Sequence, residues 1–172
     1  MKFLCQTRRN RLEIARGLIH RPRVLFLDEP TLGLDTQTRR RIWDYIRMLN
    51  RDTGVTIILT THYMEEASRL CDRLIIIDHG LILVEGKPEE LIRQHVGGNV
   101  IEIARPTNEL RSFIQSRQLP YEDLGHRLIA YCQDRGELYQ RITRDFCKEG
   151  CVMRLATLED VFLKLTGREL RE

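Results

Sequence analysis

The chain has 172 residues, 42% of them apolar, which is enough for one ordinary domain or two small ones. Its 28 basic residues exceed its 25 acidic residues by only three, and so small an excess argues against a nucleic-acid partner. No apolar run approaches the roughly 20 residues that cross a bilayer, and no signal-peptide core precedes the first arginines. The five cysteines form no C-x-x-C pair of the kind that zinc and redox sites use. We therefore expect a cytoplasmic protein.

Two short runs of branched apolar residues, 23–28 and 55–60, have the pattern of strands that are buried on both faces of a parallel sheet. Between them a helix is predicted, with Thr36 as its candidate amino-terminal cap and Gly54 at its end. Its inward residues, at helical spacing, are Ile42, Trp43, Ile46 and Leu49. Strand, helix and strand in this order predict a right-handed crossover, the core of an α/β domain.

The next elements continue this first domain. The pattern predicts a helix at 63–70, a pair of strands at 73–77 and 81–85, and a helix that Pro88 opens. The pattern then breaks at Gly97-Gly98.

The remainder has the pattern of a small α+β unit. It predicts strands at 100–104, 127–132 and 152–155, and helices at 108–117, 137–148 and from 158 onward. Thr157 and Asp160 stand at the spacing of a capping box for the last helix. We therefore expect two domains, residues 1–97 and residues 98–172.

Two adjacent carboxylates, Asp28 and Glu29, stand where the first strand ends. Ligands of open α/β sheets bind at the carboxyl ends of strands, so both acids belong to such an edge. Mg²⁺ is usually held by one or two carboxylates plus substrate phosphates, so Asp28 suits the metal while Glu29 can orient or deprotonate a water. Acids commonly end strands, so the pair becomes informative only with its neighbours.

Those neighbours are specific. The stretch VLFLDEPTLGLD, residues 24–35, and the stretch TIILTTHYMEEA, residues 56–67, resemble the nucleotide-binding domain of ABC transporters. Residues 11–16 also resemble the helix that follows the signature loop of that family. The resemblance extends from residue 4 to about residue 92, and it implies a partial P-loop NTPase-like parallel sheet.

The resemblance implies a role for each site residue, with ATP and Mg²⁺ as cofactors. Asp28 and Glu29 form the Walker B motif, with Asp28 at the metal and Glu29 as the catalytic base. Gly33 and Asp35 belong to the D-loop, which reaches across a dimer interface. His62 is the switch histidine, which donates a hydrogen bond to the γ-phosphate. From the residues alone, His62 could be a histidine satisfied at a strand end, and Asp35 could simply cap the next helix.

The phosphate-binding loop of that family, G-x-x-x-x-G-K-[ST], occurs nowhere in the sequence. Its glycines let backbone N–H groups close on the phosphates while its lysine neutralises them. The family's Leu-Ser-Gly-Gly-Gln signature aligns with residues 4–8, where Gln6 and Thr7 replace both glycines. The resemblance therefore implies the carboxyl-terminal part of an ATPase subunit that binds ATP weakly by itself. We expect the gene upstream to encode the loop.

Residues 158–167 resemble the end of ATPase subunits from bacterial drug-resistance and multidrug exporters, which carry a small accessory domain. This implies an ATP-hydrolysing exporter subunit at the inner face of the membrane, with a permease and a second ATPase subunit as partners. A second hypothesis is a non-catalytic module that dimerises with or regulates a full-length ATPase. ABC ATPases of DNA repair or translation are a third, but the sequence contains none of their coiled-coil insertions or tandem domains.

Overall fold

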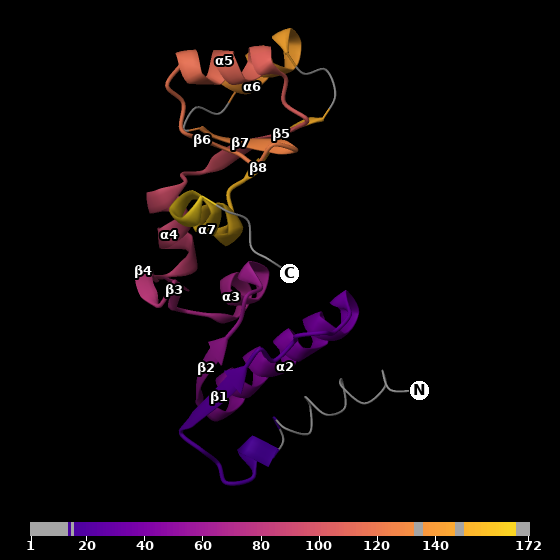
Figure 1. Ribbon diagram of the computed structural model, residues 1–172. Coiled ribbons are helices and arrows are strands. Elements are labelled where there is room, and N and C mark those ends of the chain that lie inside the picture. The colour runs from indigo at the N-terminus through magenta and orange to yellow at the C-terminus, as the bar shows by residue number, and fades with distance from the viewer. Residues whose placement is uncertain (1–13, 15, 133–135, 147–149, 168–172) are drawn as a thin grey trace. The chain divides into compact units, whose positions relative to one another are not determined.

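The computed structural model describes residues 14, 16–132, 136–146 and 150–167. Its contacts divide the chain into two compact units, Met1–Cys71 and Asp72–Glu172, each with its own strands and helices (Figure 1). The expected domain boundary after residue 97 stays a prediction. It marks the residue at which the ATPase part is expected to end, and the contacts within this chain do not test that. Among the described residues, no helix is long and apolar enough to cross a membrane.

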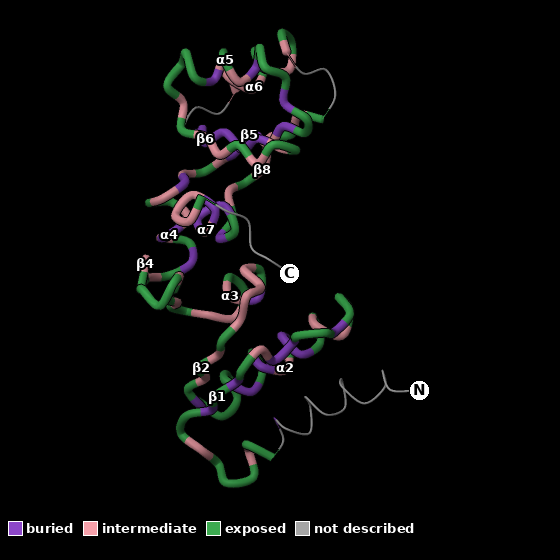
Figure 2. The backbone as a smooth tube through the Cα atoms, viewed as in Figure 1, coloured by how far each residue is buried: buried purple, intermediate pink, exposed green. Residues whose placement is uncertain are grey.

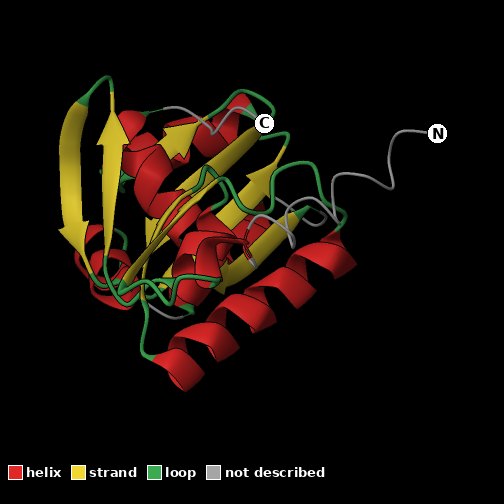
Figure 3. Ribbon diagram, turned by 90° about the horizontal axis from the view of Figure 1, so that it is seen from below, coloured by secondary structure: helices red, strands yellow, loops and turns green. Residues whose placement is uncertain are grey.

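The first unit is a strand–helix–strand crossover followed by a short helix (Figure 3). Its elements are β1 (Val24–Asp28), α2 (Thr36–Thr53), β2 (Thr56–Thr60) and α3 (Met64–Leu70). β1 and β2 pair in parallel, with Val24 opposite Thr56 and Asp28 opposite Thr60. The predicted parallel pair joined by a helix is therefore confirmed, and with it the mixed α/β class.

The amino-terminal cap of α2 is Asp35, so the prediction of Thr36 as the cap was wrong by one residue, and the alternative that Asp35 caps this helix is confirmed. The Asp35 side chain accepts a hydrogen bond from the Thr38 backbone N–H at 2.9 Å. A cap must keep an extended backbone while its side chain reaches an amide three residues on, which Asp35 does and Thr36, already helical, cannot do. At the other end, Gly54 closes the helix in the left-handed conformation, with φ of 69°.

The described residues bury only one face of the β1–β2 pair, whereas the sequence pattern predicted burial on both. Leu25 and Leu27 belong to a buried cluster with Ile42 and Ile46 of α2. The intervening residues face the opposite side, since strand side chains alternate. Phe26 is 73% exposed, and Ile58, its partner in the register, is also exposed. The alternation of buried and exposed residues along β1 is visible in Figure 2.

The second unit holds a hairpin and a four-stranded antiparallel sheet. The hairpin is β3 (Leu74–Asp78) and β4 (Leu81–Gly86), followed by α4 (Pro88–His95). The sheet has the order β6-β7-β5-β8, from β5 (Asn99–Ala104), β6 (Tyr121–Asp123), β7 (Arg127–Cys132) and β8 (Cys151–Leu155). Its helices are α5 (Asn108–Ser116), α6 (Glu137–Asp145) and α7 (Leu158–Thr166). The sequence analysis missed β6, which has only three residues and no apolar run.

The two faces of the four-stranded sheet make different kinds of contact. On one face, apolar residues of α5 and α6 pack on the sheet, for example Leu110 and Ile142 against Ile101 and Leu128. The other face carries charge. Arg154 of β8 donates two hydrogen bonds to Asp160 of α7, at 2.7 and 2.8 Å. The predicted capping box is present, since Asp160 also accepts from the Thr157 backbone N–H at 2.8 Å.

Candidate functional site

The carboxyl ends of β1 and β2 bring two of the predicted residues into contact. Glu29 follows β1 directly, and His62 follows β2 by two residues. Nδ1 of His62 lies 3.0 Å from Oε2 of Glu29, which makes an ion pair when the imidazole is protonated. The side chains of His62 and Glu29 are 32% and 28% exposed, whereas Oε2 of Glu29, the oxygen that faces His62, is itself buried.

Thr60, the last residue of β2, joins the two acidic residues to the neighbouring strand. Its hydroxyl donates to Oδ1 of Asp28 at 2.5 Å. The backbone N–H of Glu29 in turn donates to the carbonyl of Thr60 at 3.1 Å, with the Thr60 hydroxyl 3.3 Å away. Sequence reasoning missed Thr60, because its contact with Asp28 depends on the register of the two strands.

Glu29 has a left-handed backbone, with φ of 44°. A residue with a Cβ rarely adopts this conformation, which costs on the order of 1 kcal/mol and is common at functional sites. Two hydrogen bonds hold it here. Its N–H is bound to Thr60, and its carbonyl accepts from the Leu32 N–H at 3.1 Å. The chain therefore turns sharply at the residue whose carboxylate meets His62.

The loop from Glu29 to α2 contains the other two predicted residues. Gly33 has φ of 72°, a conformation that favours glycine. Asp35 caps α2, and its hydrogen bonds from Thr38 hold the pKa of Asp35 below its usual value. No hydrogen bond or ion pair among the described residues links Gly33 or Asp35 to Glu29 or His62. Their part in a dimer interface stays a prediction.

The acidic pair fits a magnesium ion that has few protein ligands. The described residues contain no group of three or more His, Cys, Asp or Glu side chains that could hold a metal alone. Mg²⁺ does not need one, because it keeps several waters and takes one or two carboxylates together with phosphate oxygens. Asp28, exposed at the end of β1, supplies such a carboxylate.

The predicted signature segment at residues 4–8 lies outside the described residues. Most of the helix expected at 11–16 does so as well. Its two described residues, Ile14 and Arg16, are helical, and Ile14 is buried.

Comparison with known proteins identifies the relatives of this chain. Residues 104–167 match the family model "Nodulation factor export protein NodI, C-terminal domain", and residues 13–67 match "AAA domain, putative AbiEii toxin, Type IV TA system". The chain is 44% identical over 167 residues to the Nod factor export ATP-binding protein I of Bradyrhizobium diazoefficiens, covering 95% of this chain and 53% of the relative. The same protein of Rhizobium sp. (strain N33) is 45% identical, with 95% and 54% covered. The chain belongs to the ABC ATP-binding subunits.

The chain spans about half the length of these ABC ATP-binding relatives. Among solved structures, cbiO1 of Clostridium perfringens, part of the ABC transporter complex cbiONQ, is 33% identical. Its superposition covers 49% of this chain and 34% of that chain, with a TM-score of 0.47.

Proposed function

We propose that this chain supplies the hydrolytic edge of an ATPase subunit that powers an ABC exporter. The observation that carries the proposal is the contact between Glu29 and His62 at the carboxyl ends of two adjacent parallel strands. A base for water and a donor for phosphate oxygens need to lie within one ligand's reach of each other. The exporter role rests on the relatives, which are named as Nod factor export proteins. The predicted multidrug cargo stays a prediction.

The proposed roles follow from what each side chain can do. Asp28 would hold Mg²⁺, with Thr60 fixing one carboxylate oxygen and leaving the other for the metal or its water. Mg²⁺, when bound with ATP, neutralises charge that develops on the phosphate oxygens. Glu29 would accept a proton from the attacking water. His62 would donate a hydrogen bond to the γ-phosphate, and Gly33 and Asp35 would face a second ATPase subunit.

The proposed assembly places this domain at the inner face of the cell membrane. A permease subunit and a second ATPase subunit are the proposed partners. Residues 1–97 would be the ATPase part and residues 98–172 an accessory domain. The alternative is a non-catalytic dimerisation or regulatory module for a full-length subunit, and the lack of a G-x-x-x-x-G-K-[ST] loop in this sequence favours it for the chain by itself.

The chain by itself is expected to bind Mg-ATP only weakly. Asp28 and Glu29 bring negative charge to a site that has neither the lysine nor the amide cradle of a phosphate loop. Isothermal titration calorimetry with Mg-ATP should therefore give a dissociation constant in the millimolar range or no measurable heat. A micromolar constant would contradict the expectation and point to a phosphate site elsewhere in the chain.

The proposed function is tested by completing the site. We would join this chain to the unmatched part of the Bradyrhizobium diazoefficiens relative and measure ATP turnover. The chimera should hydrolyse ATP, and His62→Ala should slow turnover by about 100-fold with little effect on nucleotide binding, because it removes a transition-state donor. A folded chimera that binds ATP but does not turn it over would favour the non-catalytic module.

A further inference from the structure

The most buried acid of the first unit is one that the proposed mechanism does not use. Glu66, in the short helix α3, has no exposed surface. Its Oε1 accepts two hydrogen bonds of 2.8 Å, one from the hydroxyl of Thr31 and one from Nε1 of Trp43. The other oxygen of Glu66, Oε2, is buried and has no hydrogen-bond partner. Burying a carboxyl group is costly unless hydrogen bonds compensate, so here all of the compensation comes from the two contacts at Oε1.

The two donors come from different segments. Trp43 lies on the buried side of α2, whereas Thr31 lies in the loop that leaves the sheet after Glu29. Thr31, like Glu66, is fully buried. A single carboxylate oxygen therefore ties the loop and α2 to α3.

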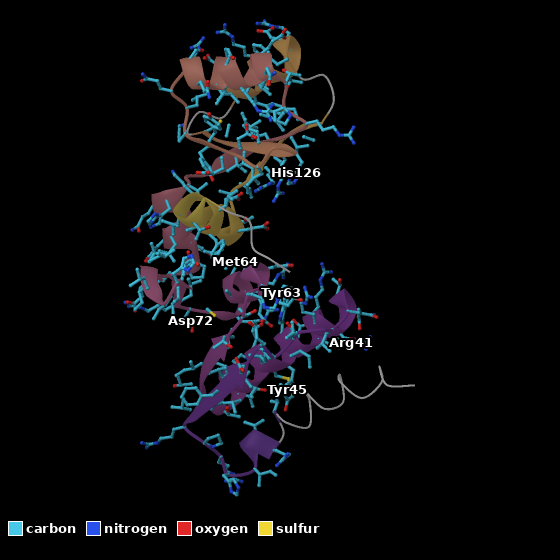
Figure 4. The ribbon with its side chains drawn as sticks, viewed as in Figure 1. Arg41, Tyr45, Tyr63, Met64, Asp72 and His126 are labelled. Carbon is cyan, nitrogen blue, oxygen red and sulfur yellow. The ribbon has the colours of Figure 1, made fainter. Side chains whose placement is uncertain are left out.

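A second contact holds the same two helices one turn away. The guanidinium of Arg39, four residues before Trp43, lies over the ring of Tyr63 at 3.9 Å, three residues before Glu66. Tyr63, labelled in Figure 4, stands at the position just before α3 and makes no capping hydrogen bond with its side chain. With two contacts on one helix pair, the rotation of α3 relative to α2 is restricted.

These contacts connect Glu66 with both Glu29 and His62 at the sheet edge. Thr31 is two residues after Glu29, and its carbonyl accepts from the Leu34 N–H at 3.2 Å. His62 immediately precedes Tyr63, and Glu66 is one helical turn further on. A shift of Glu66 would therefore move Glu29 through Thr31, and His62 through α3.

We propose that Glu66 is a positioning residue that holds Glu29 against His62, by fixing the loop after Glu29 and the start of α3 to the same point on α2. The relevance of this positioning to catalysis rests on the proposed function. The positioning itself does not, because every contact in it is within the nucleotide-free chain.

The test uses the full chain without nucleotide. Trp43 is its only tryptophan, so its indole N–H gives one resonance that reports directly on Glu66. Glu66→Ala should shift this resonance and the ring signals of His62. It should also speed amide exchange at Leu32 and Leu34 by about tenfold or more, as expected when a buried hydrogen bond that closes the loop is lost. Glu66→Gln keeps an acceptor oxygen for both donors and should restore the slow exchange and most of the His62 shift.

The matched control is Glu65→Ala, the adjacent acid on the same helix, which is exposed and pairs with Arg69. It should leave the exchange at Leu32 and Leu34 and the ring signals of His62 unchanged. The Trp43 resonance is not a readout for this variant, because Arg69, the partner of Glu65, also lies over the Trp43 ring at 5.6 Å. Thr31→Val removes only the donor from the loop, so it should speed exchange at Leu34, and it serves if Glu66→Ala does not fold.

The proposal is overturned if Glu66→Ala moves the Trp43 resonance alone and leaves the loop amides and the His62 ring unchanged. Glu66 would then only pack α3 on α2. Failure of Glu66→Gln to restore the signals would also overturn it. Since no ATP is involved, neither outcome depends on whether a completed subunit hydrolyses ATP.

Discussion

Replacing Glu29 by glutamine in the completed subunit is expected to lower ATP turnover by a factor of about 100 to 10,000, the range that a general base contributes. The amide has nearly the same shape as the carboxylate but cannot accept a proton from water. Its position is set by backbone contacts to Thr60, which the substitution does not touch. Single-turnover kinetics should show bound ATP that is cleaved very slowly, with the loss in turnover number and little change in affinity.

The control for this prediction is Glu65→Gln, the same chemical change at an exposed glutamate that pairs with Arg69 of its own helix. It should leave turnover unchanged. If Glu29→Gln turns over ATP at the rate of the parent subunit, Glu29 is not the base, and the contact with His62 has only a structural role.

Replacing Asp160 by alanine is expected to destabilise the second unit by about 3 kcal/mol. Asp160 is 1% exposed, and removing it leaves the Arg154 guanidinium with Glu102, at 2.8 Å, as its remaining charged partner and the Leu155 carbonyl, at 3.3 Å, as a weaker acceptor. Loss of one member of a buried, hydrogen-bonded ion pair costs about this much because the other charge stays desolvated. Urea denaturation followed by far-UV circular dichroism measures it. Trp43 fluorescence follows the first unit in the same experiment.

The matched control is Glu159→Ala, the neighbouring acid of α7, which is 59% exposed and lies 3.7 Å from Arg127. An exposed pair of this kind contributes about 1 kcal/mol or less, so the variant should unfold close to the parent. Equal destabilisation by both substitutions would mean that the Arg154–Asp160 pair contributes no more to the stability of this unit than an exposed ion pair does.

The same pair predicts the pH dependence of the second unit. Burial raises the pKa of Asp160, but hydrogen bonds from Arg154 and Thr157 outweigh it, and the net pKa is below its usual value. Such a group stabilises the folded state above its unfolded pKa of about 3.9, and this contribution is lost as the pH falls through the lower folded value. The difference between the parent chain and Asp160→Ala should therefore be constant near neutral pH and shrink below about pH 4.

The sequence was sufficient for features that depend on local chemistry. Apolar spacing predicted the inward face of α2, Pro88 predicted the start of α4, and the Thr157/Asp160 spacing predicted the capping box. The acid pair and His62 were singled out by the resemblance of residues 24–35 and 56–67 to ABC nucleotide-binding domains, because an acid pair or a histidine after an apolar strand is uninformative by itself.

Features that depend on strand register or on tertiary contacts could not be predicted from the sequence. The cap of α2 differed by one residue, since Asp35 and Thr36 both have capping side chains and only the backbone decides between them. Glu65 and Glu66 are adjacent and alike in composition, yet one faces solvent and the other is the most buried acid of its unit. A signal for Glu66 was present, because Tyr63, Glu66 and Leu70 share one helical face, but an acid on that face ordinarily argues against burial.

At residue 29, stability and the proposed chemistry favour different side chains, because Glu29 has a left-handed backbone. Glycine would adopt φ of 44° without strain, as Gly33 does at 72° in the same loop. A library of variants screened for thermal stability alone would thus be enriched in glycine or asparagine at residue 29, and each such gain would remove the carboxylate that contacts His62. For protein engineers, residue 29 is therefore a place where consensus or stability-guided redesign should be withheld.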